Sequence, residues 1–324
     1  MEELTDLEHL RKRPAMYIGD TTVRGLHHLF NELLDNSIDQ FLANQASTVN
    51  VSTTGSTLVF SDDGPGLPFD EPSQRSESLA HEYLTQIRHH LPTADGHTPH
   101  IHIGGWGCGL RVVTALTATC VVTSSRNGLV WRQAFSKGIE CGPPQIVPTP
   151  VNRGTTFQLT IDRELFSVDW CQHRIDNRLK DAAYLFPGFR VETPTLQFIA
   201  PRGLADLATK IANESNANDA ARVWLFNGST DEVHIHAAVA GTNSETDWRA
   251  FANGSASIEN GTHLTALKRV VAACKIKPAI ALIHVIMRNP RFAGPTRTKL
   301  EVPEIISPIY QALKPSLKEF ASTE

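Results

Sequence analysis

The segment from Leu26 to Phe41 constrains the fold most, because it carries two stripes of opposite character at helical spacing. Apolar residues recur three and four positions apart along it, the pattern of a helix with one buried face. A polar stripe of His28, Glu32 and Asn36 recurs every four residues on the other side. Such a helix must lay its apolar face on a second layer of structure, with the polar stripe turned away from that contact.

The polar stripe has an ordinary interpretation and a chemical one. A solvated helix face explains it without any function, and this is the commoner case for an isolated helix. In the chemical interpretation, Glu32 takes a proton from an attacking water and His28 orients the carboxylate. The amide oxygen of Asn36 would then bind Mg²⁺, which prefers hard oxygen ligands shared with phosphates.

The rest of the chain mixes strand and helix patterns in two blocks, which predicts an α+β protein rather than a doubly wound sheet. The polar segment 213–219 is typical of a linker and divides the chain into domains 1–212 and 213–324. Strands are expected at 49–53, 57–60, 119–124, 129–135, 155–161, 232–238 and 280–287, and further helices at 82–91, 110–116, 175–184, 265–273 and 305–320.

A turn after the second expected strand, Asp62 to Pro68, is the first of three that could hold a nucleotide. Its D-G and P-G pairs are common in plain tight turns. Alternatively, Gly64 and Gly66 let a ligand approach the backbone closely. Asp62 could then accept a hydrogen bond from an amino group, such as that of adenine.

The second turn is the glycine-rich loop 104–109, which opens onto a helix. Backbone N–H groups at a helix N-terminus suit phosphate oxygens, although a flexible loop is as common an explanation. The loop is neither a Walker A motif nor a dinucleotide-binding fingerprint. In the third turn, the hydroxyl of Thr155 could reach a bound base through water, although threonine is also simply favoured in strands.

Composition excludes several classes of protein. The net charge of −4 argues against a self-sufficient DNA-binding protein. Five scattered cysteines without a CxxC pair are typical of reduced thiols in the cytosol. The acidic N-terminus lacks an apolar signal region, and no apolar run is long enough to span a membrane. We therefore expect a cytoplasmic protein without a membrane partner.

The order of these motifs closely resembles that of the B subunits of DNA gyrase and topoisomerase IV, which belong to the wider GHKL class of ATPases. The resemblance starts with LEHLRKRPAMYIG at 7–19 and continues with GLHH at 25–28 and ELLDNSID at 32–39. The segments 251–264 and 289–300 are similar to the transducer domain of that family. The resemblance covers about residues 5 to 320.

The resemblance implies a Bergerat-type α/β sandwich followed by a smaller transducer domain of ribosomal S5-like type. It implies ATP and Mg²⁺ as ligands, with Glu32 as general base, His28 as its partner and Asn36 on the metal. Arg297 stands where the family has a lysine that senses the γ-phosphate. The other implied contacts with ATP are Asp62, Gly64, Gly66, Gly104, Gly105, Gly107, Gly109 and Thr155, and Arg132 is the implied contact with aminocoumarin inhibitors.

The sequence departs from the family in several places. Pro65 replaces an arginine, Pro295 replaces a glutamine, and the glycine loop is shorter and carries Trp106. The N-terminal arm, which covers the partner's nucleotide in dimers of the family, is also shorter. This departure bears on whether ATP drives the formation of a homodimer.

Three functions fit these features. The first is the ATPase subunit of a split or truncated type IIA topoisomerase, with an unidentified protein partner that holds the DNA chemistry. The second is a stand-alone ATP-driven switch in defence, regulation or biosynthesis. The third is a relative that binds nucleotide or drug without hydrolysis. Because no cleavage domain follows Glu324, we expect DNA to bind weakly or through the partner, and no strand passage by the chain alone.

Overall fold

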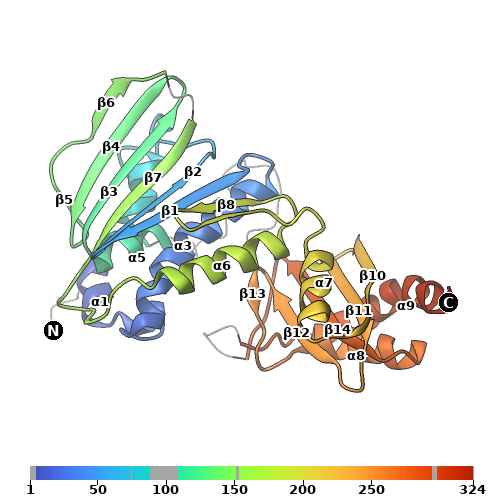
Figure 1. The fold of residues 1–324 in the computed structure, drawn as a ribbon. Coiled ribbons are helices and arrows are strands. Elements are labelled where there is room, and N and C mark those ends of the chain that lie inside the picture. The colour runs from blue at the N-terminus through green and yellow to red at the C-terminus, as the bar shows by residue number, and fades with distance from the viewer. Residues whose placement is uncertain (1–4, 74, 88–108, 151–152, 294–297, 324) are drawn as a thin grey trace. The chain divides into compact units, whose positions relative to one another are not determined.

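The computed structural model describes residues 5–73, 75–87, 109–150, 153–293 and 298–323. The chain divides into two compact units (Figure 1). One unit consists of Met1–Lys180 with Phe189–Phe198, and the other of Asp181–Gly188 with Ile199–Glu324. The predicted mixture of helices and strands in an α+β fold is confirmed.

The first unit is built on a nine-stranded sheet with the order β5-β4-β3-β7-β2-β1-β8-β9, and β6 pairs with β4 (Figure 1). β1 runs parallel to β8, and the other pairs are antiparallel. The strands are β1 (Thr48–Thr54), β2 (Thr57–Asp62), β3 (Thr117–Arg126), β4 (Leu129–Ser136), β5 (Ile139–Glu140), β6 (Gln145–Pro148), β7 (Arg153–Ile161), β8 (Arg190–Thr193) and β9 (Leu196–Phe198).

Alternating burial fixes which face of this sheet carries the core. Phe60, Phe157 and Val122 stand opposite one another on β2, β7 and β3, and all three are buried. The ring of Phe30, on helix α3 (Val23–Leu42), packs edge-on against Phe60 with centroids 6.2 Å apart. Because side chains alternate between faces along a strand, this row identifies the face that α3 covers.

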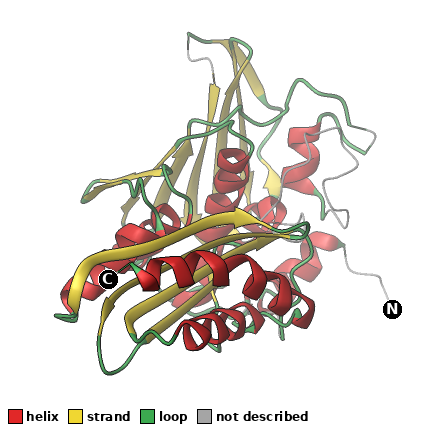
Figure 2. Cartoon of the chain, turned by 90° about the vertical axis from the view of Figure 1, so that its right-hand side faces the viewer, coloured by secondary structure: helices red, strands yellow, loops and turns green. Residues whose placement is uncertain are grey.

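Two helices of the first unit matter most for the site. α3 begins after Thr22, whose side chain accepts a hydrogen bond from the N–H of Arg24. α5 (Gly109–Leu116) contacts α3, β3 and β4, so the two helices share one face of the sheet, and Figure 2 shows the helices layered against the strands. The other helices are α1 (Asp6–Lys12), α2 (Ala15–Ile18), α4 (Leu79–Thr85) and α6 (Gln172–Leu185).

The second unit contains a five-stranded sheet with the order β10-β11-β14-β12-β13. Its central strand β14 is buried along its whole length, between antiparallel β11 and parallel β12. Helices α8 and α9 pack together and supply one side of its core. The elements are α7 (Leu204–Glu214), β10 (Asn218–Ser229), β11 (Val233–Thr242), β12 (Asp247–Ala252), β13 (Ser255–Ala256), α8 (Thr262–Cys274), β14 (Pro278–Met287), a 3₁₀ turn (Pro303–Ile305) and α9 (Ile306–Ser322).

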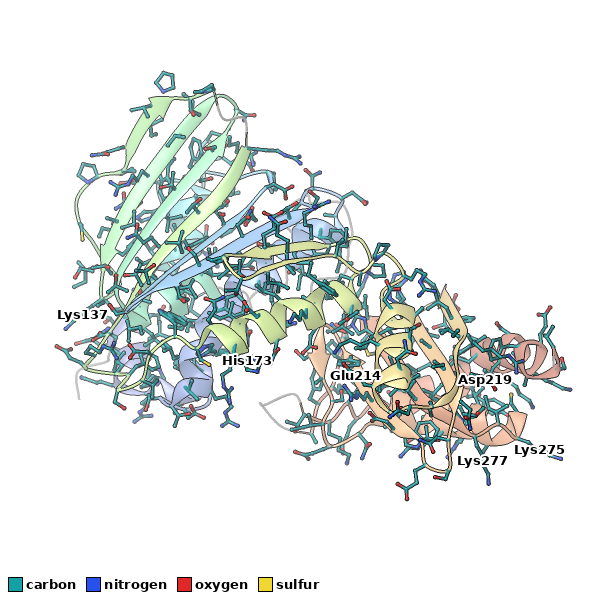
Figure 3. The ribbon with its side chains drawn as sticks, viewed as in Figure 1. Lys137, His173, Glu214, Asp219, Lys275 and Lys277 are labelled. Atoms are coloured by element: carbon teal, nitrogen blue, oxygen red, sulfur yellow. The ribbon has the colours of Figure 1, made fainter. Side chains whose placement is uncertain are left out.

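The prediction of a linker at 213–219 is wrong. The segment comprises the last turn of α7 and the first residues of β10, which Glu214 and Asp219 mark in Figure 3. α7 buries Leu204, Leu207 and Ile211 and contacts β10 and β11, so both elements belong to the second unit. The division into domains 1–212 and 213–324 stays a prediction, whereas the two compact units separate before residue 199.

Several element boundaries also differ from the expectation. The helix expected at 82–91 begins at Leu79, because Ser78 caps it by accepting a hydrogen bond from the N–H of His81. It ends at Thr85, and residues 88–91 lie outside the described part. None of the helices built from the described residues has the length and apolar character needed to cross a membrane.

Candidate functional site

The polar stripe of α3 forms the predicted pair of side chains. Nε2 of His28 lies 3.0 Å from Oε1 of Glu32, and both side chains are partly exposed. Asn36, one turn further along, is exposed. The apolar stripe of the same helix is buried, as shown by Leu29 and Leu33. An imidazole at this distance can hold a carboxylate in one orientation, as a general base requires.

The end of the glycine loop meets this stripe at Gly109, the first residue of α5. A Cβ atom on Gly109 would lie 2.0 Å from Oε2 of Glu32 and 3.0 Å from its Cδ. Carbon and oxygen atoms that are not bonded to each other cannot approach so closely. Only glycine therefore leaves the Glu32 carboxylate in its observed position, and the two motifs form a single site.

Asp62 ends β2 on the face of the sheet that α3 covers, two residues after Phe60. The N–H of Gly64 donates to its Oδ1 at 2.9 Å, and the hydroxyl of Ser37 on α3 donates to its Oδ2 at 3.0 Å. Thr155 stands opposite Asp62 on β7, so the two residues that are expected to contact adenine are cross-strand neighbours. α3 and the turn after β2 therefore meet at this carboxylate.

Burial has the largest effect on the ionisation of Asp62. Burial raises the pKa of the Asp62 carboxyl above its ordinary value, and the charge of Asp63 raises it further. Hydrogen bonds from Gly64, Ser37 and the backbone of Thr155 act in the opposite direction. The carboxylate is therefore a strong but costly hydrogen-bond acceptor, as expected of a group that recognises a ligand's amino group.

The turn after Asp62 folds back over the end of β3. The N–H of Leu67 donates to the hydroxyl of Ser124 at 2.7 Å. Gly66 has a positive φ of 80°, and a Cβ atom there would lie 2.5 Å from the carbonyl oxygen of Ser125. Gly66 is thus required by both its conformation and its surroundings.

The structure does not bring Arg132 to this site. Arg132 on β4 stands opposite Thr123, which stands opposite Thr156, one position from Thr155. It therefore projects from the face of the sheet opposite Asp62, because neighbouring residues of a strand point to opposite faces. The inhibitor contact expected for Arg132 has no support in this geometry.

Arg126 is the arginine that lies beside the turn, and the sequence motifs did not indicate it. A Cβ atom on Gly66 would lie 3.2 Å from Cβ of Arg126. Arg126 forms ion pairs with Asp70, at 2.9 Å, and with Glu71. The Asn-Gly pair after it, which begins the hairpin to β4, is the sequence pattern that would have placed it at a strand end.

Part of the predicted site lies outside the described residues: Gly104, Gly105, Gly107 and Arg297. Their roles stay predictions. Among the described residues, no group of three histidine, cysteine or acidic side chains is arranged to hold a metal ion. The exposed amide of Asn36, on the same stripe as Glu32, fits the different requirement of a Mg²⁺ ion shared with phosphates.

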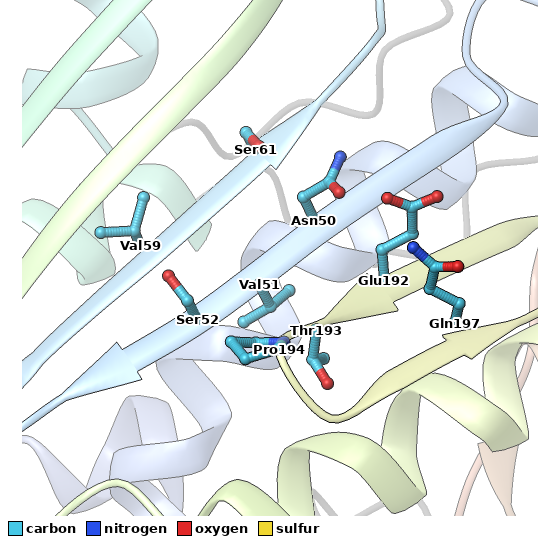
Figure 4. Close-up of a pocket in the computed structure, with 9 residues that line it drawn as sticks. All are labelled: Asn50, Val51, Ser52, Val59, Ser61, Glu192, Thr193, Pro194 and Gln197. Atoms are coloured by element: carbon cyan, nitrogen blue, oxygen red, sulfur yellow. The ribbon is translucent and has the colours of Figure 1, made fainter.

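A hollow of about 250 Å³ lies on the other face of the sheet, beside the β8–β9 hairpin (Figure 4). Asn50 on β1 stands opposite both Ser61 on β2 and Glu192 on β8, and all three side chains line the hollow. Ser61 precedes Asp62 and therefore points away from it. This hollow is separate from the candidate site.

Comparisons with known proteins show what the chain is similar to. Residues 21–165 match the family model described as histidine kinase-, DNA gyrase B-, and HSP90-like ATPase. The DNA gyrase B subunit of Campylobacter jejuni is 30% identical over 92% of this chain and 42% of its own length. The DNA topoisomerase 4 B subunit of Caulobacter vibrioides is 31% identical over 94% of this chain and 50% of its own length. The chain thus spans about half the length of these curated relatives.

The fold has close counterparts among solved structures. The 43K ATPase domain of Thermus thermophilus gyrase B, solved in complex with an aminocoumarin, superposes with a TM-score of 0.80. It is 28% identical, and the match covers 97% of this chain and 89% of that one. The ATPase region of Saccharomyces cerevisiae topoisomerase II, at 17% identity and a TM-score of 0.71, shares the fold. The predicted GHKL sandwich with a second domain is confirmed, and the chain belongs to the DNA gyrase B-like GHKL ATPases.

Proposed function

We propose that the chain binds ATP together with Mg²⁺ at the site between α3, α5 and the turn after β2, and hydrolyses it slowly. The observation that carries the proposal is the His28–Glu32 pair on α3, which contacts Gly109 of α5. The same helix contacts Asp62 through Ser37. A candidate base and a candidate acceptor for an amino group thus lie on elements that pack against each other. Both are parts that hydrolysis of a nucleoside triphosphate needs.

Each residue has a defined task in this proposal. Asp62 accepts the exocyclic amino group of adenine, with Thr155 beside it. Glu32 takes a proton from the attacking water, and His28 keeps the carboxylate turned toward that water. Asn36 would hold Mg²⁺, which supplies positive charge to the phosphate oxygens when bound. The N–H groups of the glycine loop and the cation of Arg297 would offset the remaining negative charge.

Release of inorganic phosphate from ATP in the presence of Mg²⁺ tests the proposal. We expect slow, Mg²⁺-dependent release by the purified chain, and none when the metal is chelated. Binding of ATP without any release would favour the alternative of a non-hydrolysing nucleotide-binding protein. Absence of both would reject the assignment of the site.

Gly109 provides a more specific test of the geometry. Gly109→Ala should push the Glu32 carboxylate aside, because its new Cβ would occupy the space 2.0 Å from Oε2. Turnover should fall about ten- to a hundredfold, the usual effect of a small misplacement of a catalytic group. Gly188→Ala is a control for an added methyl group away from Glu32. A Cβ there meets no atom within 4 Å, and the positive φ of 91° predicts a loss of stability without a loss of turnover. Equal turnover by both variants would contradict the close contact.

Aminocoumarin binding tests the assignment of the arginines, since the Thermus relative was solved with such a compound. We expect the wild-type chain to bind aminocoumarins more weakly than gyrase B subunits do, because Pro65 stands where the family has an arginine. Pro65→Arg should strengthen binding, and Arg126→Ala should weaken it about tenfold by removing one hydrogen-bonded cation. Arg132→Ala, on the opposite face, should change nothing in a calorimetric titration. Weakening by Arg132→Ala alone would reverse the assignment.

For the role of the whole protein we favour an ATPase subunit or switch that acts with a protein partner, as a homodimer or with another chain. The Campylobacter and Caulobacter relatives are subunits of DNA gyrase and topoisomerase IV. The net charge of −4 leaves little electrostatic drive for tight DNA binding by this chain alone. A stand-alone switch in another pathway is the alternative. Relaxation of supercoiled DNA that requires both ATP and an added partner subunit would favour the topoisomerase role.

A further inference from the structure

Ser37 connects α3 to the carboxylate at the end of β2. It is 1% exposed, and its hydroxyl oxygen lies 3.0 Å from Oδ2 of Asp62 and 3.3 Å from the carbonyl oxygen of Leu33. A hydroxyl has one proton, so it donates fully to only one of these two acceptors at a time. The carboxylate and the carbonyl therefore share a single donor.

Each choice of acceptor suits one protonation state of Asp62. When the carboxylate is ionised, Ser37 donates to Oδ2 and forms a charge-assisted hydrogen bond. When the carboxyl group is protonated, it can donate to the oxygen of Ser37, which then donates to Leu33. Neither state leaves a buried donor without an acceptor. The hydrogen bond from Ser37 stabilises the ionised state more than the protonated state, because hydrogen bonds to a charged group are stronger.

We propose that Ser37 is a positioning residue that keeps Asp62 ionised and oriented for the amino group of adenine, and so sets the preference for adenine over guanine. This inference rests on the proposed nucleotide-binding function. Adenine presents an amino donor where guanine presents the carbonyl acceptor O6. An ionised Asp62 attracts the first and repels the second, whereas a protonated Asp62 could donate to O6.

The groups around Asp62 determine whether removal of the Ser37 hydroxyl raises or lowers the pKa of Asp62. Burial raises the pKa of Asp62, and the neighbouring charge is Asp63, which also raises it. Asp63 belongs to the same turn and accepts hydrogen bonds from the N–H groups of Ser47 and Thr48. The hydrogen bonds that Gly64, Ser37 and Thr155 donate to Asp62 lower its pKa. Loss of the Ser37 hydroxyl therefore raises it.

The pH dependence of ATP binding follows from that direction. Binding that needs ionised Asp62 has its full strength above the pKa of Asp62 and weakens as pH falls through it. In Ser37→Ala the weakening should begin at a higher pH than in the wild-type protein. GTP binding should weaken less in the same range, so that the ratio of ATP to GTP affinity decreases.

The experiment is a series of calorimetric titrations of the full chain with ATP and with GTP over a range of pH. Ser37→Ala should bind ATP about tenfold more weakly at neutral pH, the value expected for one hydrogen bond to a charged group. The pH below which ATP binding weakens should be higher for Ser37→Ala than for the wild-type chain. Ser37→Thr, which keeps the hydroxyl, should restore both properties. Ser37→Cys, which keeps the size but donates poorly, should behave like Ser37→Ala.

Different results would contradict the positioning role of Ser37 and the proposed nucleotide-binding function. An unchanged pH profile and an unchanged ATP to GTP ratio in Ser37→Ala and Ser37→Cys would overturn the positioning role, even if Asp62→Ala abolishes binding. A wild-type chain that binds neither nucleotide would overturn the proposed function, and this inference with it. Thermal melting of each variant shows whether it is folded, and Ser37→Cys decides the matter if Ser37→Thr does not fit the buried position.

Discussion

Glu32→Ala is expected to bind ATP as tightly as the wild-type chain and to release phosphate about a thousandfold more slowly. A general base acts only in the chemical step, and its removal typically costs a factor between about a hundred and ten thousand. The side chain is partly exposed and pairs with His28, so its truncation leaves no buried charge behind. Single-turnover phosphate release, measured beside a calorimetric titration with ATP, separates the two effects.

The control for this variant is Glu245→Ala, which removes an exposed glutamate from the second unit. It should hydrolyse ATP at the wild-type rate. His28→Ala should hydrolyse ATP at a rate between those of Glu32→Ala and Glu245→Ala, because it removes the group that orients the carboxylate but not the base itself. Wild-type turnover by Glu32→Ala would show that another group activates the water.

Asp62→Ala should lose at least about a hundredfold in ATP affinity. The amino group of adenine would lose a charged acceptor and the N–H of Gly64 would lose its acceptor, while the hydroxyl of Ser37 would keep the carbonyl oxygen of Leu33. Sites built on such a hydrogen bond also reject bases that lack the donor, so GTP should compete poorly with ATP for the wild-type chain. Competition against a fluorescent ATP analogue measures both quantities.

Asp63→Ala is the matched control, because Asp63 neighbours Asp62 but bonds to Ser47 and Thr48 at the start of β1. We expect it to lower the melting temperature and to keep the preference for adenine at neutral pH, because loss of the Asp63 charge lowers the pKa of Asp62 and favours its ionised form. Equal affinity of the wild-type chain for ATP and GTP would reject the role of Asp62 in reading the base.

Local spacing predicted the helix at the centre of the site and the hairpin that faces it. The apolar and polar stripes of α3 follow from a period of 3.6 residues, and β1 and β2 follow from alternation around Gly55. The contact of Glu32 with Gly109 could not be predicted from spacing, because it depends on how α5 packs against α3. The order of motifs indicated only that both belong to one site.

The arginines show why the face of a strand is difficult to predict. Arg126 and Arg132 lie on successive strands of one hairpin, and the sequence motifs indicated only Arg132. Which of them reaches the turn depends on register, and a shift by one residue exchanges the two faces. The importance of Ser37 was not predictable for a related reason, since it comes from a contact with β2 rather than from its own neighbours in α3.

The contact between Gly109 and Glu32 also limits how the sequence can vary. Any side chain at position 109 requires the carboxylate to withdraw, and Glu32→Asp would withdraw it by one methylene group. Substitutions at the two positions should therefore be non-additive, so that Gly109→Ala harms a chain carrying Glu32→Asp less than it harms the wild type. Two motifs that are distant in the chain are thereby coupled energetically through one contact.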